Sequence, residues 1–233
     1  MALPTLSAPE FITAVPSTGE EIKYRPFLVK EEKILLMALE GNDQDEITNA
    51  ILKILGNCII SDIDINTLAT FDVEYLFLKL RGKSVGEVIE LKVGHSNPDN
   101  ACTHRTEIDI NIDAIEVVGE ISDGKIQIDD NIGVKVRFAG MTDIKQIDTD
   151  STSDLFKLIS NCIEFVYDDE NVYGDFTVKE MEKWLEQLSS EQFSKITTFF
   201  NESPKLQHKV AWKCPECGKE DELILEGLAA FFT

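Results

Sequence analysis

The spacing of apolar residues along the chain changes between a helical and a strand period, and this predicts alternating helices and hairpins. In DQDEITNAILKILGNCI, Ile47, Ile51, Leu52 and Leu55 fall on one helical face, with acidic residues at the start. The flanking segments KEEKILLMALEG and DVEYLFLKLRGK also fit helices. Apolar and polar residues alternate in EVIELKVG, RTEIDINI and GKIQIDDNIGVKVRF, which predicts strands with a turn in the last segment.

The order of these elements recurs after about residue 142. STSDLFKLISNCIEFVYDD indicates a helix running into an acidic connector, as ITNAILKILGNCIISDIDI does, and both helices end in Asn-Cys-Ile. A helical region with a capping box from Thr177 to Glu180 follows, and each half closes with a predicted hairpin. We interpret the pattern as an internal duplication; the alternative is a chance similarity of two ordinary helix–hairpin units.

The predicted fold class is therefore α+β, with two related helix-plus-β-hairpin halves. Residues 1–41 form an N-terminal extended segment, a strand and a helix. Residues 42–141 form the first half and residues 142–233 the second. The alternative is that all three segments build one compact domain.

Two cysteines lie three positions apart in the turn of the last predicted hairpin, WKCPECGKEDEL. Cys214 and Cys217 supply half of a four-ligand metal site, and the sequence contains no second CxxC. Superimposing the two terminal hairpins places His95 over Cys214 and Cys102 over Cys217. One histidine and three cysteines form a set known from structural zinc sites, so we expect a Zn²⁺ that pairs the hairpins as in a zinc ribbon.

Other readings of these residues stay open. His104 or His208 could replace a ligand of the first half, or the first half-site could be a relic that binds no metal. A redox CxxC is a further alternative, although that motif favours a helix N-terminus, and the Gly218 turn here favours a hairpin. Cys58 and Cys162 end amphipathic helices among apolar neighbours, which indicates buried thiols.

The overall composition narrows the class of protein. The 233 residues carry a net charge of −21, which disfavours binding to a phosphate backbone. The sequence lacks a long apolar run and a secretory signal pattern, so we expect a cytoplasmic protein without a membrane span. Five unevenly spaced cysteines argue against a disulfide framework. Without a phosphate loop or a recognisable nucleophile and base, we predict that the chain is not an enzyme.

One stretch carries a resemblance to a known family. VPSTGEEIKYRPFLVKEEKILLMALEG, residues 15–41, together with the amphipathic helix ending near Cys58, resembles the baseplate hub family of T4-like contractile-tail bacteriophages. Proteins of that family have a similar length, open with a Pro-rich segment and often end in a Cys-containing hairpin. At the first metal half-site this chain departs from the expected pair of cysteines, since it offers His95 and Cys102.

The resemblance implies a protein of phage morphogenesis. It would act in host cytoplasm during assembly of the baseplate hub, as a chaperone or as a structural component of the virion, through contacts with hub, tail tube or tape-measure proteins. An acidic protein suits this role because it can shield basic surfaces of an unassembled partner. Phe231 and Phe232 in the C-terminal LAAFFT would either form a docking surface for a partner or pack into the core. The alternatives are a zinc-ribbon adaptor for nucleic acid or a nucleic-acid enzyme, and a thiol oxidoreductase using Cys214 and Cys217.

Overall fold

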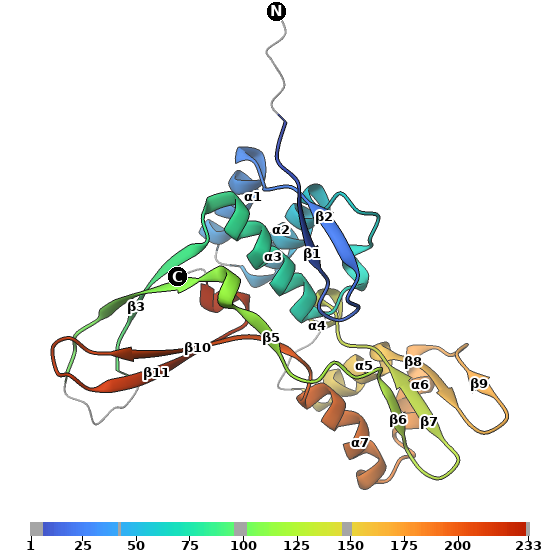
Figure 1. Ribbon diagram of the computed structural model, residues 1–233. Coiled ribbons are helices and arrows are strands. Elements are labelled where there is room, and N and C mark those ends of the chain that lie inside the picture. Colours follow the sequence, from blue (N-terminus) through green and yellow to red (C-terminus); the bar gives the residue numbers. More distant parts are fainter. Residues whose placement is uncertain (1–6, 42, 96–101, 146–150, 232–233) are drawn as a thin grey trace, which may run out of the picture. The chain divides into compact units, whose positions relative to one another are not determined.

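Helices and small antiparallel sheets alternate along the chain, which gives an α+β fold (Figure 1). The computed structural model describes residues 7–41, 43–95, 102–145 and 151–231. The chain divides into two compact units. The first unit comprises residues 1–65, 71–118 and 205–233, and the second unit comprises residues 66–70 and 119–204. The segments 1–41, 42–141 and 142–233 describe a repeat along the chain and stay a prediction.

The first unit contains most of the helical residues and both terminal hairpins of the predicted repeat. β1 and β2 form one hairpin, β3 and β4 a second, and β10 pairs with both β11 and β5. The elements are β1 (Phe11–Ala14), β2 (Glu21–Tyr24), α1 (Val29–Gly41), α2 (Gln44–Cys58), α3 (Thr70–Val85), β3 (Val88–Val93), β4 (Thr106–Asn111), β5 (Glu116–Val118), β10 (Lys205–Lys213) and β11 (Glu220–Glu226).

Helix α2 shows how the sequence pattern becomes packing in the first unit. The Asp43 side chain caps it by accepting hydrogen bonds from the backbone N–H groups of Asp45 and Glu46, at 2.8 and 3.2 Å. Its fully buried face runs through Ile51, Ile54, Leu55 and Cys58 rather than through Ile47 and Leu52, which are half-buried. The helix is therefore where the pattern predicted it, but its core face is rotated.

The second unit is a four-stranded antiparallel sheet, in the order β6-β7-β8-β9, with helices packed against it. Its core is apolar and includes Val134, Ile159, Met181, Leu185 and Ile196. The elements are β6 (Lys125–Gln127), β7 (Gly133–Val136), α4 (Met141–Ile144), α5 (Thr152–Cys162), β8 (Ile163–Tyr167), β9 (Val172–Tyr173), α6 (Val178–Leu185) and α7 (Ser190–Asn201).

One prediction for the second unit is wrong and another is made more precise. Helix α5 ends at Cys162, as the Asn-Cys-Ile end predicted, but the residues IEFVY that follow form strand β8 rather than leading directly into an acidic connector. β-Branched and aromatic residues favour a strand, and β8 pairs with both β7 and β9. The helical region after Asp175 is two helices: the predicted capping box at Thr177 opens α6, and a second one at Ser189 opens α7.

An arginine joins a strand to two helices in the first unit. The Arg25 backbone N–H donates to the Cys58 carbonyl at 3.0 Å, and its guanidinium donates to Glu31 Oε1 at 3.1 Å and to the Asn57 carbonyl at 2.9 Å. The Glu31 side chain is fully buried and also accepts from the Leu28 backbone N–H at 2.9 Å. A buried carboxylate needs such partners, so this arginine staple fixes the end of α2 against the start of α1.

The second unit contains the same arginine staple. The Arg137 backbone N–H donates to the Cys162 carbonyl at 2.9 Å, and its guanidinium contacts the Asn161 carbonyl at 3.0 Å. The guanidinium also binds both oxygens of Asp143, at 2.7 and 3.0 Å, and Asp143 accepts from the Gly140 N–H at 2.8 Å. Each staple thus pairs an arginine with a carboxylate six residues later and with the Asn-Cys end of a helix.

None of the helices in the described part of the chain combines the length and the apolar character needed to cross a bilayer.

Candidate metal centre

Two hairpins of the first unit bring the predicted ligands together. His95 lies just past the end of β3 and Cys102 lies shortly before β4, in the loop that joins the two strands of that hairpin. Cys214 follows β10 and Cys217 precedes β11, in the tight turn that joins these strands (Figure 1). Residues 96–101 of the β3–β4 loop lie outside the described residues.

The four ligand atoms lie within 4.8 Å of one another and could hold a metal ion. The sulfurs of Cys102 and Cys214 are 3.9 Å apart, and the sulfur of Cys217 is 3.3 Å from His95 Nε2. Zinc bonds of about 2.3 Å to sulfur and about 2.0 Å to nitrogen require, in a tetrahedron, about 3.8 Å between sulfurs and about 3.6 Å between sulfur and nitrogen. The donor set and its spacing therefore fit a tetrahedral site, whereas a disulfide would need about 2.05 Å.

The CPEC turn has the geometry of a hairpin and not of a helix start. The Cys214 N–H donates to the Lys219 carbonyl at 2.9 Å, and the Gly218 N–H donates to the Cys214 carbonyl at 2.9 Å. Gly218 adopts a φ of +71°, which a glycine accepts without strain. The turn leaves Cys214 buried and Cys217 exposed. Both thiols lie between two strands, and among the described elements neither lies at the start of a helix.

The thiols of Cys214 and Cys102 differ in acidity because of the groups around them. Hydrogen bonding from the Cys217 backbone N–H, with further help from His95 and Glu216, lowers the pKa of Cys214 to about 6 despite burial. The pKa of Cys102 is raised: the His104 backbone N–H lowers it, but burial and the neighbouring thiols outweigh that contact. Thiols this close disfavour each other's ionisation, and a bound cation would remove that conflict.

Residues outside the ligand set orient His95. Its Nδ1 lies 3.4 Å from Asp221 Oδ2, and its ring lies 5.0 Å from the Trp212 ring, so the side chain is only 3% exposed. A carboxylate at Nδ1 directs Nε2 toward Cys217, which is how carboxylates commonly support ligating histidines. The sequence reasoning missed both supporting residues, which are cross-strand partners in the β10–β11 hairpin.

The other two histidines do not join this group. His104 pairs with Glu216 at 3.1 Å and is 36% exposed, and His208 lies within β10 opposite Leu225. Among the described residues the structure thus gathers His95, Cys102, Cys214 and Cys217, the set that hairpin superposition predicted.

The remaining two cysteines are buried, as expected. Cys58 and Cys162 lie at the ends of α2 and α5 with no exposed surface. Burial raises the pKa of Cys58 to about 11 and that of Cys162 to about 12, so both thiols stay protonated at neutral pH.

Comparison with known proteins places the whole chain in one family. The family described as T4 bacteriophage base plate protein matches residues 8–233. The chain is 26% identical over 213 residues to the baseplate hub assembly protein gp26 of Enterobacteria phage T4, an alignment that covers 91% of this chain and 92% of that protein. No solved structure matches the chain. Since the match spans nearly every residue, including the stretch 15–41 that indicated it, this chain belongs to the T4 bacteriophage base plate protein family.

Proposed function

We propose that this chain is an assembly protein of the phage baseplate hub, which acts through contacts with other proteins and without catalysis. The observation that carries this proposal is the similarity to a baseplate hub assembly protein over about nine-tenths of both chains. A match of that extent covers nearly the full length of both proteins, so a shared role is a better explanation than a shared motif.

The metal centre serves this function as a structural element. His95, Cys102, Cys214 and Cys217 bind one Zn²⁺ in a closed, four-ligand site that has no open position for water or substrate. The ion ties two hairpins whose ligands are 112 residues apart in the sequence, in an arrangement like that of a zinc ribbon. Binding the ion would therefore contribute to the stability of the first unit.

The duplication that we infer explains why each hairpin supplies two ligands. Its support is the arginine staple, which recurs with the same donors, the same six-residue spacing and the same Asn-Cys helix end around Arg25 and Arg137. Two unrelated units would have no reason to share these contacts. With the staples aligned, each copy starts at the hairpin before its arginine, β1–β2 or β6–β7, which is earlier than the predicted residues 42 and 142. Each copy then consists of that hairpin, two helices, a further helical segment and a terminal hairpin that carries half of the zinc site.

The charge of the chain favours partners with basic surfaces. A net charge of −21 attracts positively charged patches on hub, tail tube or tape-measure proteins before they assemble in the host cytoplasm, and it opposes binding to nucleic acid. A zinc-ribbon adaptor that binds nucleic acid is the competing function, and it would require a basic surface that this composition disfavours.

The test is recovery of a tagged copy of the chain from infected cells, with quantitative mass spectrometry of what it carries and of finished virions. We expect hub subunits in fixed proportion to the chain in the lysate. A fixed copy number in virions would identify a structural component, and absence from virions would identify a chaperone that departs. Recovery with nucleic acid or nucleic-acid enzymes, and without hub subunits, would contradict the proposal.

A further inference from the structure

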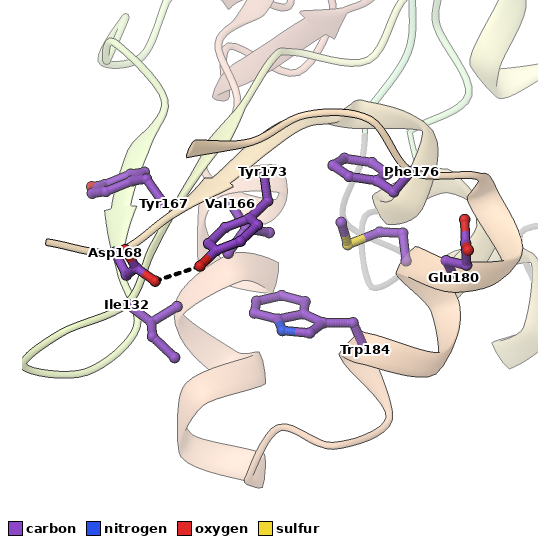
Figure 2. Close-up of a pocket in the computed structure, with 9 residues that line it drawn as sticks. Ile132, Val166, Tyr167, Asp168, Tyr173, Phe176, Glu180 and Trp184 are labelled. Carbon is purple, nitrogen blue, oxygen red and sulfur yellow. Dashed lines mark hydrogen bonds between the residues drawn. The ribbon is translucent and has the colours of Figure 1, made fainter. Parts of the chain in front are cut away.

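A cavity of about 440 Å³ opens on the second unit, between the β8–β9 strand pair and helix α6 (Figure 2). Its floor is apolar, with Val166 and Met181 buried beneath it. Tyr173, Phe176 and Trp184 form its aromatic walls, and their rings surround one space in Figure 2. The Tyr173 side chain remains half exposed, so its ring is available to a molecule that enters from solvent.

Two carboxylates stand on opposite sides of this aromatic space (Figure 2). Asp168 accepts hydrogen bonds from the Tyr173 hydroxyl at 2.8 Å and from the Asn171 backbone N–H at 2.7 Å, so its position is fixed. Glu180 is fixed in the same way by the backbone N–H and hydroxyl of Thr177, at 2.8 and 2.7 Å.

Both carboxylates are charged at neutral pH. The Tyr173 hydroxyl and neighbouring backbone N–H groups lower the pKa of Asp168, and the Thr177 backbone N–H and hydroxyl lower the pKa of Glu180. Lys183 lies close enough to contribute to the second shift, yet it does not line the cavity. The charged side chains among the described lining residues are therefore both negative.

Aromatic faces and carboxylates both favour binding of a positively charged group. The face of an aromatic ring carries partial negative charge and attracts ammonium and guanidinium groups, most strongly in the case of tryptophan. The carboxylates add Coulomb attraction, while the apolar floor favours an aliphatic stem or a neighbouring apolar side chain. An apolar cavity with a few fixed polar groups is the common form of a binding site.

We propose that this cavity binds an arginine or lysine side chain, together with an adjoining apolar residue, on a short segment of a partner protein. This proposal rests on the proposed function, since it names the chemistry of the partner that the assembly protein would contact. In this cavity two carboxylates lie beside aromatic rings, so a basic side chain of a partner could bind at one defined place.

The two tryptophans allow a direct test in the full-length protein. Trp184 lines the cavity, whereas Trp212 lies beside His95 in the first unit and serves as an internal reference. The probe is the dipeptide acetyl-Leu-Arg-amide, titrated while the indole N–H signals are followed by NMR. Acetyl-Leu-citrulline-amide, which has nearly the same shape without the charge, is the matched probe. We expect the Trp184 signal alone to shift, with about tenfold weaker binding of the citrulline probe.

Matched variants separate charge from folding. The double variant Asp168→Asn/Glu180→Gln removes both charges and keeps an oxygen that accepts from the backbone N–H groups, while the new amide of residue 168 can donate to the Tyr173 hydroxyl in place of accepting from it. It should weaken the arginine probe about tenfold without affecting the citrulline probe. Its control, Glu186→Gln/Glu202→Gln, removes two exposed charges of the same unit that do not line the cavity. We expect that control to bind the arginine probe within about twofold of the unaltered protein.

Three results would overturn the proposal: equal affinity for both probes, a Trp184 signal that never saturates, or equally tight binding of arginine amide alone, which would indicate a site for small cations. None of these results bears on hub assembly, which is judged by the partners recovered from infected cells. Conversely, if the probes bind at Trp184 in a charge-dependent way but no hub subunits are recovered, the proposed binding site would stand and the assembly role would be rejected.

Discussion

Replacing Cys217 with serine removes one ligand from the proposed zinc site and disturbs little else. The Cys217 side chain is exposed, so the substitution buries no new polar group and leaves no cavity. Its sulfur lies 3.3 Å from His95 Nε2, within the group that would hold the ion. We expect bound zinc to fall from one ion per chain to a small residual fraction.

The expected loss of stability follows from the loop that the ion closes. Cys102 and Cys214 are 112 residues apart, and an ion bound to both restricts the unfolded chain as a cross-link would. Closing a loop of that length is worth about 5 kcal/mol in chain entropy. Whole domains unfold at about 5–15 kcal/mol, so Cys217→Ser should lower the free energy of unfolding by a large part of the total.

The assay combines urea unfolding with metal analysis by mass spectrometry. Cys102→Ser should lose the same ion and the same stability, and the double variant should lose no more than either single one, because both act on one site. His104→Gln is the matched control, since His104 is near the turn but pairs with Glu216. A Cys217→Ser protein that keeps its zinc, or loses it without loss of stability, would refute the reasoning. Zinc retained in Cys102→Ser would show that the halves do not share an ion.

Three further predictions concern the thiols and the arginine staples. Cys58 and Cys162 should resist alkylation by iodoacetamide at pH 8 in the folded protein, because burial raises their pKa to about 11 and about 12; labelling as fast as in urea would contradict this. Arg137→Lys should lower the free energy of unfolding in urea by about 2 kcal/mol, because lysine cannot reproduce the bidentate contact with Asp143. Arg25→Lys should lower it by a similar amount. An unchanged free energy of unfolding in both variants would show that the staple does not stabilise the fold. Burial alone would raise the pKa of Asp143, but hydrogen bonds from Arg137 and Gly140 outweigh burial and hold the pKa below that of an unfolded aspartate. The staple therefore stabilises the folded protein above about pH 3.9, and this stabilisation is lost as the pH falls further. Asp143→Asn should therefore flatten the acid side of a stability-against-pH curve, and an unchanged slope would contradict the assignment.

The four residues of the candidate metal centre could be proposed from the sequence because half of their signal is local. A CxxC in a hairpin turn is recognisable without tertiary information, and aligning one hairpin with the other led to His95 and Cys102. The residues that orient the histidine could not be found in the same way. Asp221 and Trp212 act through the register of β10 and β11, and that register becomes visible only when the strands are paired.

The second unit shows a different limit of sequence patterns. The end of α5 at Asn-Cys-Ile was predicted, but the five residues IEFVY before the acidic residues were not recognised as a strand; pairing with β7 and β9 makes them β8. The acidic residues after Tyr167 indicated a solvated connector. The fold instead places Asp168 in the lining of a cavity with Tyr173, Phe176 and Trp184. All four lie within residues 168–184, but they follow neither a helical nor a strand period, because β9, a connecting segment and α6 each supply one ring.

The arginine staples were not recognised from the sequence, although the arginine, asparagine and cysteine of the two staples are identical. Arg25 and Arg137 each precede a carboxylate by six positions, but one carboxylate is Glu31 and the other Asp143, and the residues between them differ. Both arginines also donate to a backbone carbonyl at the end of a helix. Every residue has such a carbonyl, so the sequence does not indicate which one accepts the hydrogen bond.

The central claim is that the chain acts in assembly of the baseplate hub, and the most direct test is to withhold it during infection. Its synthesis would be blocked, and baseplates and tails in the lysate would be counted by sedimentation and electron microscopy. We predict that finished hubs and tails disappear while heads and unassembled hub subunits accumulate, and that supplying the chain from a plasmid restores them. Tailed particles in normal number without the chain would contradict the account.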